Sequence, residues 1–267
     1  MCVCVCVAMK VVKILSGSGW VVGLTCLDEE LFVLHQRDDN QVEVYSAKTY
    51  APLRQFHVNG LAKHRHNDMT SCVEQMCLFI SDCTNKCVHK SSKNGNILAM
   101  WPVHDSSTGL SLTPSNNLLF ACRESRRLRE LCSNSGECVR QIDLPPEIEE
   151  PRYAVQRPSQ QYVITHCGVV RHRVCLVDPD SRVSLSYGDE PGSDATEVNF
   201  PTHVAVDEDH FMFVGDWSNK RIVLLSDGLQ LVRHIELKKQ PCRLYLDRVT
   251  RRLYVGHVNG DVTIIQV

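Results

Sequence analysis

The feature that most constrains the fold is a unit of four short apolar runs that recurs along the chain. The unit is clearest between residues 200 and 240. Its four runs are Val204–Val206, Phe211–Val214, Ile222–Leu225 and Leu231–Leu237. Turn sequences such as SDG at 226–228 separate them, and short β-rich runs broken by such turns predict a four-stranded antiparallel meander. One such sheet exposes an apolar face that it cannot bury alone, so the unit predicts neighbouring copies.

Six copies can be placed by an aromatic residue in the second run of each, at spacings of 41 to 51 residues. These aromatics are Phe32, Phe79, Phe120, Tyr162, Phe213 and Tyr254. A period in the forties with four strands per unit is typical of propeller blades. We therefore expect an all-β protein, a six-bladed β-propeller of four-stranded antiparallel blades. The predicted blades are residues 20–60, 61–105, 106–146, 147–198, 199–239 and 240–267.

The last copy ends after three runs, so its fourth strand must come from elsewhere in the chain. Residues 10–19 contain VVKIL, which is similar to the fourth-strand sequence LVRHIEL that begins at Leu231. We expect this segment to form the outer strand of the last blade, because a shared blade closes the ring and covers a strand edge. The alternative is a disordered N-terminus beside an open blade. Cys and Val alternate from Cys2 to Val7, and residues 1–9 are interpreted as low-complexity sequence or an incorrectly assigned start.

The fifth copy resembles the NHL repeat. The resemblance rests on PTHVAVD at 201–207, VGD at 214–216 and NKRI at 219–222. It implies a six-bladed propeller similar to the C-terminal propeller of tripartite-motif (TRIM-NHL) proteins. In those proteins RING and B-box zinc domains and a coiled coil precede the propeller. This sequence contains none of them, so ubiquitin-ligase activity would need residues outside it.

Composition excludes several classes of function. The 267 residues carry a formal net charge of −2, so overall charge favours neither nucleic acid nor a membrane surface. No apolar run approaches the length of a membrane span, and no membrane association is expected. The 14 cysteines are scattered, mostly within predicted strands, where a free cysteine behaves as a small apolar residue. We therefore expect a reducing, cytoplasmic location.

The second copy contains a run of potential zinc ligands. They are Cys72, Cys77, Cys83, Cys87 and His89. They fall on at least three successive strand segments and include no C-x2-C pair, whereas zinc sites usually draw on paired, closely spaced ligands. The blade pattern accounts for their positions, and no metal site is predicted.

Basic residues are concentrated in the second-to-third strand loops and the strands that follow them in three consecutive copies. They are Arg123, Arg126, Arg127 and Arg129 in copy three, Arg171 and Arg173 in copy four, and Lys220 and Arg221 in copy five. In a propeller these loops and the inter-blade links emerge on one face. Acidic residues at 147–150 and 189–197 reach the same face, so its charge is mixed.

The central channel of a six-bladed propeller can hold a metal-dependent active site. The residues expected near the start of the innermost strands are Leu24, Thr70, Leu110, Tyr153, His203 and Arg243. None is a carboxylate, and Arg243 would repel a cation, whereas calcium needs several converging oxygen ligands. The sequence also lacks HExxH, GxSxG and P-loop motifs. No enzyme activity, metal or cofactor is therefore predicted, and a metal-dependent lactonase-type hydrolase is the least favoured hypothesis.

Two binding functions remain open. The favoured one is a non-enzymatic platform that recognises a protein partner through the face formed by the inter-blade links and second-to-third strand loops. Trp217, Arg221 and Arg243 are its candidate anchors. The alternative is single-stranded RNA binding through the basic loops, with Tyr153 or Trp217 stacking on bases. The sequence leaves the oligomeric state open.

Overall fold

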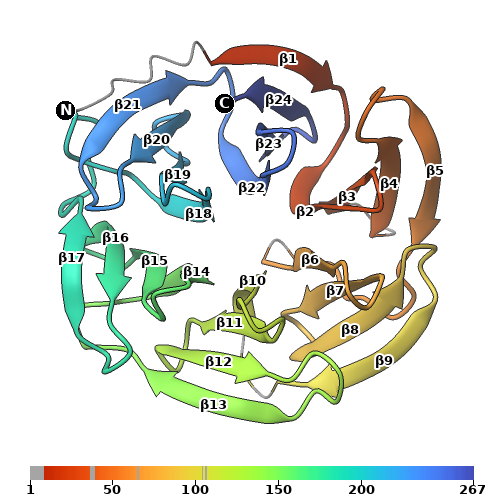
Figure 1. Ribbon diagram of the computed structural model, residues 1–267, viewed down its shortest axis with the longest axis horizontal. Coiled ribbons are helices and arrows are strands. Elements are labelled where there is room, and N and C mark those ends of the chain that lie inside the picture. The colour runs from red at the N-terminus through yellow and green to blue at the C-terminus, as the bar shows by residue number, and fades with distance from the viewer. Residues whose placement is uncertain (1–8, 37–39, 65, 104, 106) are drawn as a thin grey trace.

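The protein is a six-bladed β-propeller (Figure 1). The computed structural model describes residues 9–36, 40–64, 66–103, 105 and 107–267. These residues form six four-stranded antiparallel sheets. They contain no helix that is long and apolar enough to cross a membrane. The predicted fold class is confirmed.

Each of the first five blades is one continuous meander, with its first strand innermost. Blade one contains β2 (Trp20–Leu27), β3 (Glu30–Gln36), β4 (Gln41–Ser46) and β5 (Pro52–His57). Blade two contains β6 (Asp68–Cys72), β7 (Cys77–Asp82), β8 (Cys87–Ser92) and β9 (Ile97–Pro102). Blade three contains β10 (Ser107–Leu112), β11 (Leu118–Cys122), β12 (Arg127–Leu131) and β13 (Cys138–Asp143). Blade four contains β14 (Pro151–Gln156), β15 (Tyr162–Cys167), β16 (His172–Val177) and β17 (Val183–Tyr187). Blade five contains β18 (Pro201–Val206), β19 (Met212–Asp216), β20 (Arg221–Leu225) and β21 (Leu231–Glu236).

Blade six combines both ends of the chain, as predicted. It contains β22 (Pro241–Asp247), β23 (Arg252–His257), β24 (Val262–Gln266) and, as its outer strand, β1 (Lys10–Leu15). The β1–β24 pairing is antiparallel, and Leu15 lies opposite Val262. Because β1 covers the outer edge of β24 (Figure 1), no unpaired edge remains between the strands where the ring closes.

The core is divided among the seams between neighbouring blades. One apolar cluster, for example, joins Val22 and Phe32 of blade one to Leu78 of blade two. Another joins Tyr254 of blade six to Leu24 of blade one. All six second-strand aromatics used to place the repeats are at most 2% exposed. Burial of one such side chain stabilises the fold by about 1.5–3 kcal/mol, so each blade depends on its neighbours.

Candidate functional site

A buried polar network lies where the innermost strands converge. The carboxylate of Asp68 on β6 accepts a hydrogen bond from Arg243 Nε on β22 at 3.1 Å. His203 Nε2 on β18 lies 3.7 Å from the other carboxylate oxygen, and the rings of His203 and Tyr153 have centroids 3.5 Å apart and are tilted by 31°. Strands of blades two, four, five and six therefore meet in this network.

Electrostatics hold the network in one charge state. Burial alone would raise the pKa of Asp68, but the Arg243 charge and the His203 contact lower it below its usual value. Burial lowers the pKa of His203 despite the nearby carboxylate, so the imidazole is neutral at pH 7. Burial likewise raises the pKa of Tyr153 well above its usual value. The Asp68 carboxylate and the Arg243 guanidinium therefore form the charged pair of the network.

The position of Asp68 corrects one sequence prediction. We expected Thr70 at this place in blade two and no carboxylate among the channel residues. Strand β6 instead begins at Asp68 and pairs with β7 without a register shift. The innermost strands of the other five blades each have a bulge or irregularity near their start. The alignment by repeats could not show this missing bulge. The side chains of Leu24 and Leu110 pack into seams between blades. The backbone of Leu110 still joins the network, because its nitrogen donates to Asp68 Oδ2 at 2.9 Å and its carbonyl accepts from Tyr153.

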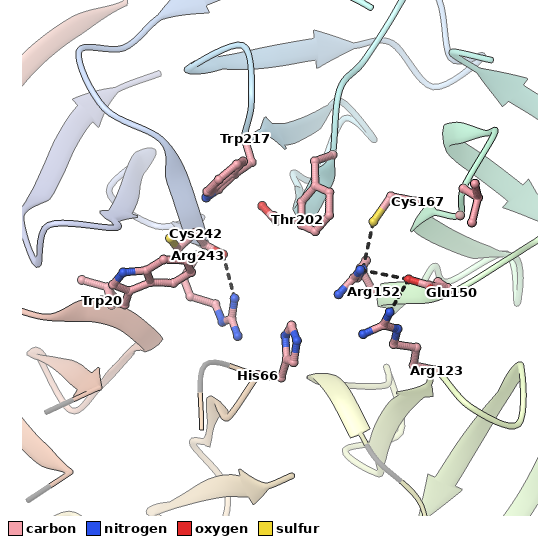
Figure 2. A pocket seen from close by; sticks show the side chains of 14 residues that line it. Trp20, His66, Arg123, Glu150, Arg152, Cys167, Thr202, Trp217, Cys242 and Arg243 are labelled. Carbon is pink, nitrogen blue, oxygen red and sulfur yellow. Dashed lines mark hydrogen bonds and ion pairs between the residues drawn. The ribbon is translucent and has the colours of Figure 1, made fainter. Parts of the chain in front are cut away.

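A pocket of about 540 Å³ opens above this network. Its lining comes from blades one, three, four, five and six and from the link between blades one and two (Figure 2). The volume lies within the range of about 300–1,000 Å³ that is usual for ligand sites. The face is the one predicted, because Arg123 and Trp217 follow second strands and Glu150 and Phe200 lie in links between blades.

One wall of the pocket is aromatic. Trp217 lies between Trp20 and Phe200, with ring centroids 6.5 Å and 5.6 Å away. The guanidinium of Arg152 on β14 lies 4.7 Å from the centroid of the Phe200 ring. All three aromatic side chains are partly exposed, so they can contact a ligand as well as one another.

A second wall, which meets the first where Arg152 contacts Phe200, is cationic (Figure 2). Arg123 and Arg152 share one carboxylate, that of Glu150, at 2.6 Å and 3.1 Å. Arg152 also donates through Nε to the sulfur of Cys167 at 2.9 Å. Two guanidinium groups against one carboxylate leave this wall with one net positive charge. The side chain of His66 projects toward the pocket from the edge between the two walls (Figure 2).

The pocket thiols are in a state that disfavours nucleophilic chemistry. Burial raises the pKa of Cys167, even though neighbouring Arg152 opposes the shift. Burial also raises the pKa of Cys242 to about 12. Reactive cysteines are thiolates with lowered pKa values, so both of these groups are neutral thiols at pH 7.

The structure separates the predicted site residues into three groups. Arg123, Trp217 and Arg243 line the pocket, and Tyr153 and His203 belong to the channel network beneath Arg243. The third group consists of basic residues outside both. Its members are Arg126, Arg127, Arg129, Arg171, Arg173, Lys220 and Arg221.

Most of this third group is engaged within the protein. Arg127 pairs with Asp143, and Arg171 and Arg173 both lie against Asp189. Arg129 donates to a backbone carbonyl, that of Val103. Such pairs reduce the local positive charge that phosphate groups would need. Arg126 and Lys220 are exposed, at turns with φ of 52°.

Arg221 is a structural residue of blade five. It is 5% exposed and its Nε donates to Asp216 at 2.7 Å. Its remaining nitrogens donate to the carbonyls of Ser193, Asp194 and Glu197. The side chain therefore ties blade five to the link that precedes it and is not available as an anchor for a partner.

Sequence reasoning missed Trp20, Glu150, Arg152, Cys167 and Phe200 as pocket residues. Their only sequence signal was position, since each lies at the start of a first strand, at the end of a second strand or in a link. In the blades that line the pocket, those places face the channel mouth. The sequence does not distinguish an arginine that lines a pocket, such as Arg152, from one whose side chain extends into solvent.

Comparisons with known proteins give the fold and no family. No protein-family model matches the chain, and no curated protein sequence matches it. Among solved structures, the chain is similar to a catalytically inactive virginiamycin B lyase from Staphylococcus aureus with quinupristin. The TM-score is 0.69 at 10% identity, covering 97% of this chain and 99% of that one. A selenomethionine-substituted form of the same lyase gives a TM-score of 0.65 at 9% identity, with the same coverage.

Proposed function

We propose that this propeller is a non-enzymatic binding platform that recognises a protein partner through its channel-mouth pocket. The observation that carries the proposal is the pairing of an aromatic wall, Trp20 with Trp217 and Phe200, with a wall that has one net positive charge. The partner segment that fits presents an apolar or aromatic side chain beside a carboxylate. Buried aromatic and arginine anchors are the residues that usually dominate such interfaces.

Exposed apolar residues extend this surface beyond the pocket. Val169 lines the pocket and is 90% exposed, and the adjacent Val170 is 58% exposed. Both lie in the turn between β15 and β16. An apolar rim beside a concave site favours a peptide that continues out of the pocket. We therefore expect the partner chain to leave the pocket across this turn.

Two features support binding over catalysis. The pocket cysteines are neutral thiols, and the Arg243 guanidinium occupies the channel, where a catalytic cation would need to bind. The resemblance of blade five to the NHL repeat is also consistent with a binding role, and similarity to a lyase at 10% identity concerns the fold alone. A protein-binding role agrees with the cytoplasmic location expected from the cysteine content.

The proposal is tested by selecting from a random peptide display library on the purified chain. We expect enrichment of sequences with an acidic residue next to an aromatic or large apolar one. The selected peptide should lose affinity for Trp217→Ala and Arg123→Ala variants. The matched control is Arg182→Ala, because Arg182 is exposed and pairs with Asp180 on an outer turn.

A second arm tests the RNA alternative with a randomised single-stranded RNA pool, followed by fluorescence anisotropy at low and moderate salt. Saturable RNA binding that falls steeply with salt and is lost in Arg126→Glu, without peptide enrichment, would replace the peptide proposal. Peptide enrichment that ignores Trp217→Ala would place the binding surface elsewhere.

A further inference from the structure

Blade two contains a buried cluster of three metal-binding side chains, away from the pocket. Asp82 ends β7, and Cys87 and His89 lie on β8. They are 0%, 6% and 2% exposed, respectively. One potential ligand atom from each lies within 4.8 Å of the other two. The cysteines of the sequence pattern that lie outside this cluster are Cys72, Cys77 and Cys83. Cys72 and Cys77 pack in the apolar seam between blades two and three, and Cys83 is buried but does not belong to the cluster.

The spacing of the ligand atoms suits a tetrahedral zinc-type ion. His89 Nε2 lies 3.5 Å from Asp82 Oδ2 and 3.6 Å from Cys87 Sγ. Bonds of about 2.3 Å to sulfur and about 2.0 Å to nitrogen, opened at the tetrahedral angle, separate these two atoms by about 3.5 Å. The nitrogen–oxygen separation worked out in the same way is about 3.3 Å. The third pair, Asp82 and Cys87, has its ligand atoms within 4.8 Å of each other.

Blade five shows what the cluster replaces. Asp216 lies opposite Arg221 in the β19–β20 register, and Asp82 lies opposite Cys87 in the β7–β8 register. In blade five the guanidinium of Arg221 neutralises the buried carboxylate at 2.7 Å. In blade two Cys87 occupies the position of this arginine, so the buried Asp82 carboxylate has no arginine opposite it.

Backbone hydrogen bonds hold the Asp82 carboxylate in the cluster. Asp82 accepts hydrogen bonds from the backbone nitrogens of Ala62 and Asn85 at 2.8 Å and 2.9 Å. These hydrogen bonds stabilise the carboxylate form of Asp82. Hydrogen-bonded carboxylates are the usual form of metal-ligating ones. His89 Nδ1 has no hydrogen-bond partner among the described residues, so the polar contacts of the ring are with the cluster.

We propose that Asp82, Cys87 and His89 form a binding site for a zinc-type divalent cation. The ion supplies in blade two the positive charge that Arg221 supplies in blade five. Oxygen, thiolate and imidazole together suit zinc, and three protein ligands leave one coordination position open. Binding releases the thiol proton of Cys87 to solvent. The ion would connect β7 to β8. Through the hydrogen bond between Asp82 and Ala62 it would also hold the segment that joins blades one and two.

The test starts from a parent chain without its accessible competing thiols. Cysteines that could bind metal adventitiously are replaced by serine, namely the exposed Cys138, the partly exposed Cys26 and Cys132, and three that lie outside the described residues, Cys2, Cys4 and Cys6. The parent is titrated with Co²⁺ and then with Zn²⁺. We expect one equivalent of Co²⁺ to produce a thiolate-to-cobalt charge-transfer band, Zn²⁺ to abolish it, and Zn²⁺ to raise the melting temperature.

The variants identify the ligands. Cys87→Ala should remove the band, and His89→Gln should weaken Co²⁺ binding by about tenfold or more. Cys77→Ala is the matched control, because it removes another buried thiol of the same blade and should keep the band. X-ray absorption at the zinc edge of the parent should show a single sulfur ligand, which decides the question even if a variant fails to fold. The proposal is overturned by no stoichiometric binding, by a band that survives Cys87→Ala, or by two or more sulfur ligands.

Discussion

Removal of Arg243 should destabilise the propeller strongly, because it leaves a buried carboxylate without its counter-charge. Arg243 is 7% exposed and Asp68 is 1% exposed. Besides its bond to Asp68, the guanidinium donates to three backbone carbonyls, those of Val22, Asn67 and Cys242. Breaking a buried ion pair by removing one partner costs about 3–5 kcal/mol. We expect Arg243→Leu to lower the free energy of unfolding by about that amount at neutral pH.

The cost should also depend on pH, with a sign that follows from Asp68. In the native protein the Asp68 pKa is lowered, so its contribution is complete above the pKa of the unfolded chain and is lost as pH falls through the lower folded value. Without Arg243, burial dominates and the folded pKa rises above the unfolded one. The penalty is then greatest at neutral pH and shrinks toward acid. Protonation of the adjacent His203, opposed by burial and by Arg243, acts in the same direction.

Urea unfolding followed by tryptophan fluorescence measures both effects, since Trp20 and Trp217 lie near the network. The midpoint should fall with an unchanged m-value. The difference from the native chain should narrow between about pH 7 and about pH 5, by up to about 1.4 kcal/mol per unit. Arg182→Leu, at an exposed ion pair, should leave the midpoint unchanged. A cost below about 1 kcal/mol, or one independent of pH, would refute this account of the network.

Three further predictions concern packing, closure and thiol chemistry. Phe213→Ala should cost about 3–5 kcal/mol in urea unfolding, because Phe213 is 2% exposed, while Val249→Ala at a 95% exposed site should cost nothing measurable; equal effects would contradict the seam model. Deletion of residues 1–15 should uncover the edge of β24 and cause self-association on size exclusion, whereas an unchanged monomer-to-oligomer distribution would argue against ring closure by β1. Maleimide labelling at mildly alkaline pH should modify the exposed Cys138 well before Cys175, whose pKa burial raises to about 12; the reverse order in mass spectrometry would rule this out.

The sequence by itself determined the number of blades, the register of the second strands and the closure by the N-terminal strand. These features are encoded locally. Apolar alternation over five to eight residues defines a strand, and one aromatic residue per copy, whose side chain is buried between neighbouring blades, identifies the second strand. The same local pattern made Leu15 and its neighbours recognisable as an outer strand. Because the pattern recurs in every copy, the copies in which it is clear indicate where the strands lie in the copies in which it is less clear.

The tertiary structure alone decided the pocket and the charges around it. Asp68 and Arg243 are separated by 175 positions in sequence, and which carboxylate meets which arginine depends on strand register and on the single innermost strand that lacks a bulge. Glu150 likewise joins Arg123 and Arg152 of different blades. Sequence patterns show the charge of a side chain but not its neighbours. Ion pairs between blades join residues that are far apart in sequence. Only the folded structure therefore shows which arginines remain available to a partner.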